Sequence, residues 1–173
     1  MPGTRQGAAR VAPCVGSVRR HLSGPRRTWL IILHGNAGDR YDRLTWFHML
    51  KESLGCGVVC FDYRGYGGSS GAPSQRGLYL DGEAVATWAR EGGVIPRGDR
   101  VVLYGESIGS SVATWMATKR RFDGLVLQAP FTSIADAGQI LYPFLPVKVR
   151  GRRFHWLSVP PLPLRAPQYG CSL

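Results

Sequence analysis

The sequence predicts an α/β fold, with a mainly parallel sheet and helices on both of its faces. Short continuous apolar runs, which are typical of strands buried on both sides, alternate with segments of helical periodicity. Such strict alternation favours parallel strands joined by helical crossovers. The chain has 173 residues, of which 44% are hydrophobic and 19% charged, and these values fit one globular domain.

Four apolar runs predict four parallel strands, and three periodic segments predict the helices between them. The predicted strands lie near residues 29–33, 57–61, 100–104 and 124–128, and the helices near 41–54, 78–89 and 107–120. Gly55 follows the first helix in the manner of a C-terminal glycine. In parallel sheets ligands bind beyond the carboxyl ends of the strands, so candidate site residues should follow the strands directly.

The formal charge of +11 belongs to the two ends of the chain. Residues 1–28 carry six arginines and no acid, residues 146–173 carry five basic residues and no acid, and the middle is neutral. We therefore expect a basic, disordered segment at 1–28, a folded core at 29–147 and a basic, proline-rich, disordered tail at 148–173. The Arg-rich start is equally compatible with an organelle transit peptide or with a misplaced start site.

This charge distribution also bears on partners. A nucleic-acid groove normally lies on the folded domain, so no nucleic-acid partner is expected. Weak contact of the basic ends with anionic membrane is compatible with the charge. The four cysteines, Cys14, Cys56, Cys60 and Cys171, show no metal-ligand spacing and no C-x-x-C motif, which predicts an intracellular, reducing compartment without a structural disulfide or a metal site.

Gly105-Glu106-Ser107-Ile108-Gly109 matches the motif G-x-S-x-G, and its context gives the match weight. A nucleophile elbow needs a strand just before it and a helix just after it, and both are predicted here. A second match at 67–71 lies in a glycine-rich loop before Pro73 and fails this test. The simpler alternative is an ordinary strand-turn-helix in which Ser107 only caps the helix.

An oxyanion hole needs two backbone N–H donors that converge on one point. The N–H of Ile108, directly after the serine, is one expected donor, and the N–H of Asn36, in the loop after the first predicted strand, is the other. His34 precedes that loop, and we expect it to shape the loop rather than act as a base. No phosphate-binding loop and no dinucleotide fingerprint occurs, so no cofactor is expected.

Five sequence blocks in order resemble the α/β-hydrolase superfamily, in particular its serine-aminopeptidase-like and depalmitoylating-thioesterase-like branch. They lie at 33–44, 61–74, 77–85, 103–113 and 129–137. The resemblance implies that Ser107 is the nucleophile, that Asn36 and Ile108 form the oxyanion hole, and that the 62–67 loop braces the site. It also implies a serine hydrolase of acyl esters or thioesters, with a small-molecule or acylated substrate.

The resemblance stops near residue 147, before the family's last two strands, whose loops carry the acid and the histidine. We therefore expect a truncated, partial hydrolase fold. Asp136 and His155 are the remaining triad candidates in the order Ser, Asp, His, although no strand precedes His155. A missing base predicts low turnover, about 10⁴–10⁶-fold below an intact triad. The alternative function is a non-catalytic remnant that binds a ligand or a protein.

Overall fold

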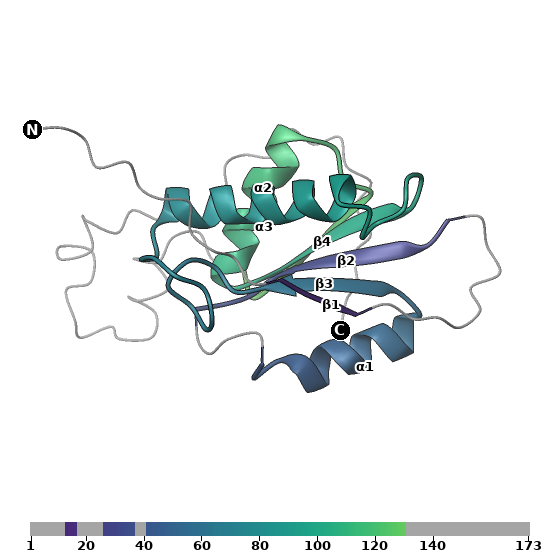
Figure 1. The fold of residues 1–173 in the computed structure, drawn as a ribbon, viewed down its shortest axis with the longest axis horizontal. Coiled ribbons are helices and arrows are strands. Elements are labelled where there is room, and N and C mark those ends of the chain that lie inside the picture. Colours follow the sequence, from purple (N-terminus) through teal and green to yellow (C-terminus); the bar gives the residue numbers. More distant parts are fainter. Residues whose placement is uncertain (1–12, 17–25, 37–40, 131–173) are drawn as a thin grey trace, which may run out of the picture.

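The computed structural model describes residues 13–16, 26–36 and 41–130 (Figure 1). Five strands form one sheet in the order β1-β3-β2-β4-β5. The strands are β1 (Pro13–Gly16), β2 (Thr28–Leu33), β3 (Gly57–Phe61), β4 (Arg100–Glu106) and β5 (Gly124–Gln128), and the helices are α1 (Leu44–Leu54), α2 (Gln75–Glu91) and α3 (Ile108–Lys119). Strands β2 to β5 are parallel to one another, which confirms the predicted parallel sheet.

The four predicted strands and three predicted helices are all present, with boundaries shifted by a few residues. Gly55 follows α1 in the left-handed conformation, at φ 59°, as a glycine after a helix commonly does. Ser74 caps the N-terminus of helix α2, and its hydroxyl accepts a hydrogen bond from the Gly77 N–H. The helix begins at Gln75, a few residues before the predicted start near residue 78.

Strand β1 lies within residues 1–28, for which the sequence predicts a basic, disordered segment. It pairs antiparallel with β3, and Cys14 lies opposite Cys60. Strand β1 has only four residues, from Pro13 to Gly16, and is too short to show an alternating pattern. Its formation therefore depends on pairing with the edge of β3 rather than on a local sequence pattern. The proposed division of the chain at residues 28 and 147 stays a prediction.

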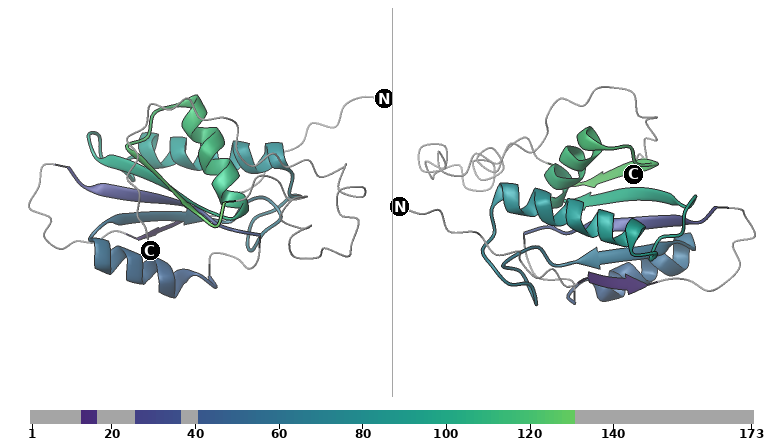
Figure 2. Two further views of the ribbon diagram at one scale, coloured as in Figure 1. Left: turned by 180° about the vertical axis from the view of Figure 1, so that it is seen from behind. Right: turned by 45° about the horizontal axis from the view of Figure 1, so that its top comes forward.

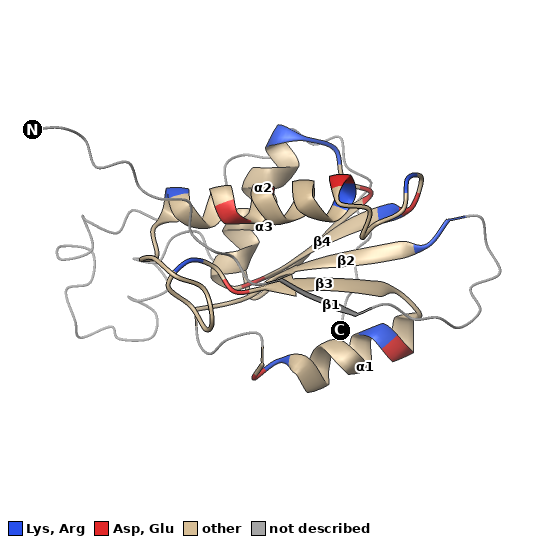
Figure 3. Cartoon of the chain, viewed as in Figure 1, with Lys and Arg blue, Asp and Glu red and all other residues tan. Residues whose placement is uncertain are grey.

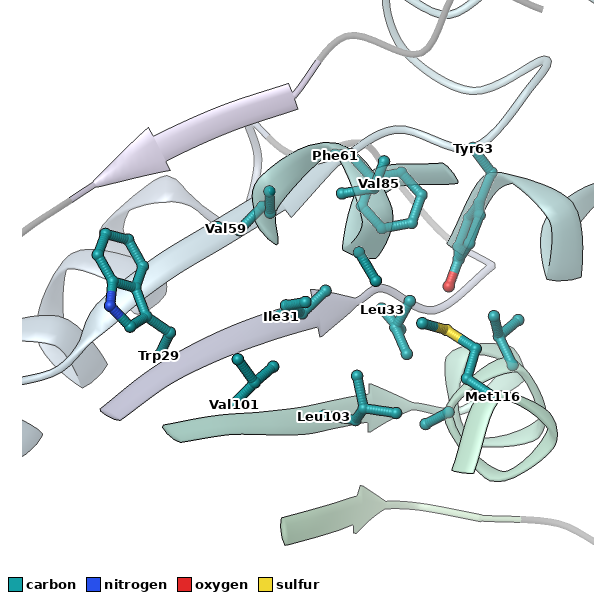
Figure 4. Close-up of a cluster of buried hydrophobic side chains, with 14 of the residues drawn as sticks. Trp29, Ile31, Leu33, Val59, Phe61, Tyr63, Val85, Val101, Leu103 and Met116 are labelled. Carbon is teal, nitrogen blue, oxygen red and sulfur yellow. The ribbon is translucent and has the colours of Figure 1, made fainter. Parts of the chain in front are cut away.

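Helices cover both faces of the sheet, α1 on one side and α2 with α3 on the other (Figures 1 and 2). Side chains of the strands alternate between two buried clusters. Leu30, Ile32 and Val58 pack in the cluster that contains Phe47 of α1. The larger cluster lies under α2 and α3 and includes Trp29, Ile31, Leu33, Val59, Phe61, Leu103 and Met116 (Figure 4).

The chain order of the sheet reverses between β2 and β4. The connection through α1 places β3 on one side of β2, and the connection through α2 then returns the chain to place β4 on the other side. Such a reversal separates the loops that follow the two central strands and leaves a crevice at their carboxyl ends, where ligands of open α/β sheets bind. The residues after β2 and β4 are therefore the ones to inspect.

Candidate active site

Ser107 lies at the turn between β4 and α3, as the elbow interpretation requires. Its backbone adopts φ 51° and ψ −115°, a sparsely populated conformation for a residue with a side chain. The Ser107 hydroxyl makes no capping hydrogen bond to α3. This argues against the simpler alternative, because a capping serine has extended backbone and an oxygen bonded to the helix N–H groups.

The two motif glycines allow the strand and the helix to approach closely. A methyl group at Gly105 would lie 2.6 Å from the carbonyl oxygen of Gly109, and one at Gly109 would collide with the carbonyl oxygen of Leu33. The first turn of α3 therefore packs directly on the end of β2. Any side chain at either position would force the helix away from the sheet and move Ser107.

Strand β5 also holds the turn in place. The Ser107 N–H donates to the carbonyl of Gln128 at 2.9 Å. The Ser110 hydroxyl donates to the carbonyl of Gly105 at 2.9 Å and to that of Gln128 at 3.3 Å. One backbone bond and two bonds from the Ser110 side chain thus fix the turn at Ser107 to the carboxyl ends of β4 and β5.

The loop after β2 lies beside Ser107. A methyl group at Gly35 would lie 3.4 Å from the Cβ atom of Ser107. Asn36 follows and is exposed, and its side-chain oxygen accepts a 2.6 Å hydrogen bond from the Tyr66 hydroxyl. Ile108 is the first residue of α3, so its N–H has no partner within the helix. The chain thus brings together the two segments assigned to the oxyanion hole, and the donor role of Asn36 and Ile108 stays a prediction.

His34 is a structural residue in this arrangement. It is 1% exposed, its Nδ1 lies 2.8 Å from the Gly35 carbonyl, and the Tyr63 N–H donates to its Nε2 at 3.4 Å. This pattern places the proton on Nδ1 and occupies both ring nitrogens. Burial lowers the pKa of His34, which keeps the ring neutral. The expected role in shaping the loop fits these contacts better than a role as base.

An ion pair that no sequence pattern indicated joins the residue before α1 to the elbow. Arg43, just before α1, binds Glu106 through a 2.8 Å contact from Nε and a 3.3 Å contact from the terminal nitrogen. Glu106 immediately precedes Ser107, and a methyl group at Gly35 would come within 3.3 Å of its carboxylate. The pair therefore connects the two ends of the 34–43 segment to the elbow. The only sequence signal was the acidic residue inside the G-x-S-x-G motif.

The loop after β3 is braced by carboxylates, consistent with the expected supporting role of residues 62–67. Asp62, fully buried, accepts from the Gly68 N–H at 3.3 Å, and its carbonyl accepts from the Ser69 hydroxyl at 2.7 Å. Arg64 forms a bidentate pair with Asp81 of α2, with the shortest contact at 2.7 Å. Ser69, the serine of the second G-x-S-x-G match, thus serves the loop and has no elbow.

Asp136 and His155 lie outside the described residues. Among the residues that the structure describes, no group of three or more histidine, cysteine, aspartate or glutamate side chains is placed to hold a metal ion. Within the same residues no helix has the length and apolar character needed to cross a membrane. Acidic and basic residues lie mainly on helices and loops, and the strands carry few of them (Figure 3).

Comparison with known proteins adds to this geometry. The family model described as "alpha/beta hydrolase fold" matches residues 28–154. Protein Rv2307c of Mycobacterium tuberculosis is 42% identical over 129 residues, which cover 74% of this chain and 45% of that protein. Lysophosphatidylserine lipase ABHD12 of Bos taurus is 36% identical over 142 residues, which cover 77% of this chain and 34% of that protein.

A solved structure shows the same fold. An alpha-beta hydrolase from Vibrio vulnificus superposes with a TM-score of 0.60 at 22% identity, covering 76% of this chain and 49% of that protein. This chain therefore spans less than half the length of the curated relatives described above.

Proposed function

This chain belongs to the α/β-hydrolase family, and from that premise we propose that it hydrolyses acyl esters or thioesters with Ser107 as the nucleophile. One observation carries the proposal. Ser107 has a positive φ and a hydroxyl that caps nothing, at the turn from β4 to α3, where the first turn of the helix packs on the end of β2. A fold gains no stability from such a residue, so its conformation calls for another explanation.

The reaction follows from the surroundings of the serine. The Ser107 oxygen attacks the acyl carbon, the alcohol or thiol leaves, and water releases the acyl group from the enzyme. The negative oxygen that forms in each step lies near the start of α3, where the Ile108 N–H and the helix dipole favour negative charge. The N–H of Asn36 is the proposed second donor.

The substrate class is supported by the chemistry of the site and by one relative. A nucleophilic serine with an oxyanion hole is suited to a carbonyl that becomes tetrahedral. The bovine relative is named a lipase, which favours an acyl ester over an amide. The proposed substrates are therefore acylated molecules with an oxygen or sulfur leaving group.

His34 is not the base that activates Ser107, because both of its ring nitrogens are engaged. The base must therefore be another residue. Asp136 and His155 are the remaining triad candidates in the sequence, and we propose that they do not complete a triad with Ser107. They follow Ser107 in the family's order, and the absence of a predicted strand before His155 weighs against them.

Hydrolysis of short-chain p-nitrophenyl esters and of an acyl thioester tests the proposal. We expect slow turnover by the wild-type chain, a fall to the buffer rate in Ser107→Ala, and no change in His155→Ala. Fast turnover that is lost in Ser107→Ala, Asp136→Ala and His155→Ala would instead assign the full triad to this chain. Turnover that persists in Ser107→Ala would contradict the proposed nucleophile.

A further inference from the structure

Two cysteines far apart in the sequence occupy directly opposed positions in the sheet. Cys14 of β1 and Cys60 of β3 are Cα partners in the antiparallel ladder. Opposed residues in antiparallel strands have Cα atoms about 4.5–5.5 Å apart, and disulfides span Cα separations of about 4.4–6.8 Å. The backbone register therefore satisfies the distance that a disulfide requires.

We propose that Cys14 and Cys60 form a redox-responsive disulfide that joins β1 covalently to the sheet. This modification site is independent of the proposed hydrolase activity. In a reducing compartment both residues stay thiols, and an oxidising challenge closes the bond. The bond then holds the short N-terminal strand on β3, the strand whose carboxyl end leads into the loop beside the site.

The other described cysteine does not fit such a bond. Cys56 lies four residues before Cys60, so along an extended strand the two are about 13 Å apart, beyond the reach of a disulfide. Because Cys60 is the residue opposite Cys14, Cys56 is also too far from Cys14 to bond with it. Burial also raises the pKa of the Cys56 thiol, which lowers its share of reactive thiolate. Cys56 is therefore a matched control within the same buried cluster.

The chemistry needs a two-electron oxidant, and we name a small disulfide such as oxidised glutathione. One cysteine thiolate attacks the oxidant, forms a mixed disulfide and releases one reduced thiol. The second cysteine thiolate attacks the protein sulfur of that mixed disulfide and releases the second thiol. Two cysteine thiols are oxidised, one small disulfide is reduced to two thiols, and the two protons end on the released thiols.

The test uses the full chain in glutathione buffers of graded ratio, followed by alkylation and mass spectrometry. We expect a cross-link between tryptic peptides 11–19 and 52–64 that dithiothreitol reverses. Peptide 52–64 contains both Cys56 and Cys60, so Cys56→Ser is the variant that separates them. The cross-link should persist in Cys56→Ser and disappear in Cys14→Ser and in Cys60→Ser.

A second readout is thermal stability. The bond would close a long loop, so the oxidised wild-type chain should melt about 5 °C or more above the reduced chain, and Cys14→Ser should show no such difference. Cys14→Ser alters an edge strand only, so it remains informative if Cys60→Ser fails to fold. A cross-link through Cys56 or Cys171, or wild-type chain that gains only glutathione adducts, would overturn the proposal.

Discussion

The Ser107 backbone has a conformation that costs stability, and the cost can be measured. A residue in a sparsely populated region of this kind costs about 1–3 kcal/mol. Glycine adopts positive φ freely but loses about 0.5–1 kcal/mol of chain entropy on folding. We therefore expect Ser107→Gly to raise the free energy of unfolding by about 1 kcal/mol.

Ser107→Ala is the matched control, because it removes the hydroxyl and keeps the strained φ. Its free energy of unfolding should stay close to that of the wild-type chain, since the hydroxyl makes no capping bond. Urea unfolding of the three proteins gives the comparison. A Ser107→Gly protein less stable than Ser107→Ala would mean that the turn is not strained.

His34 makes stability depend on pH in a definite direction. Its pKa is lowered by burial from the ordinary 6.5, so the unfolded chain binds a proton at pH values where the folded chain does not. The free energy of unfolding should therefore fall as pH falls below about 6.5. The loss grows as the pH falls from the ordinary pKa of histidine toward the lowered pKa of His34 in the folded chain.

His34→Gln removes that titration. Its free energy of unfolding should fall less over the same pH range, although the variant is less stable at pH 7 because the ring contacts with Tyr63 and Tyr66 are lost. Urea midpoints at four pH values give both slopes. Equal slopes in the two proteins would mean that His34 is accessible to protons in the folded chain.

Among the elements, the connection between the loop after β3 and helix α2 depends on one charge pair. The Asp81 side chain is 3% exposed. The Arg64 side chain donates three hydrogen bonds to the Asp81 carboxylate, from Nε at 3.0 and 3.1 Å and from a terminal nitrogen at 2.7 Å. Arg64→Leu leaves a buried carboxylate unpaired, which costs about 3–5 kcal/mol. We expect this variant to unfold at a much lower urea concentration.

A double-mutant cycle identifies the cause. Arg64→Leu combined with Asp81→Leu removes both charges, so the loss should be clearly smaller than the sum of the two single losses. Additive losses would show that the two side chains act separately. The exposed pair Lys51–Glu52, whose glutamate side chain is 55% exposed, is a comparison cycle expected to give a coupling near zero.

The elements predicted from sequence were those with strong local patterns. The run Val58-Val59-Cys60-Phe61 is apolar throughout because the strand is buried on both faces, so the run itself identifies the strand without any polar alternation. β1 has no such pattern, and only its pairing with β3 defines it. Arg43 and Glu106 are 63 residues apart in the sequence, so no local rule connects them. Ser107, in contrast, was predicted because its motif is local.

For the whole molecule, the excess of positive charge lies in residues 1–28 and 146–173, and it predicts a salt-dependent interaction. The chain should bind vesicles that contain anionic phosphatidylserine. Each basic residue near the membrane surface should contribute about 1 kcal/mol to the free energy of binding. Binding should be lost at high salt and absent with neutral vesicles, as measured by co-sedimentation. Binding that is unchanged by salt would contradict an electrostatic origin.

The central claim is that the Ser107 hydroxyl is the nucleophile, and labelling with a fluorophosphonate tests it most directly. Tryptic peptide 101–119 holds Ser107, Ser110 and Ser111, and peptide 65–76 holds Ser69 of the second motif match, so fragment spectra locate the label. We predict time-dependent labelling of the folded chain at Ser107, none in Ser107→Ala, and unchanged labelling in Ser111→Ala. A folded wild-type chain that stays unlabelled, or a label on another serine that persists in Ser107→Ala, would contradict the account.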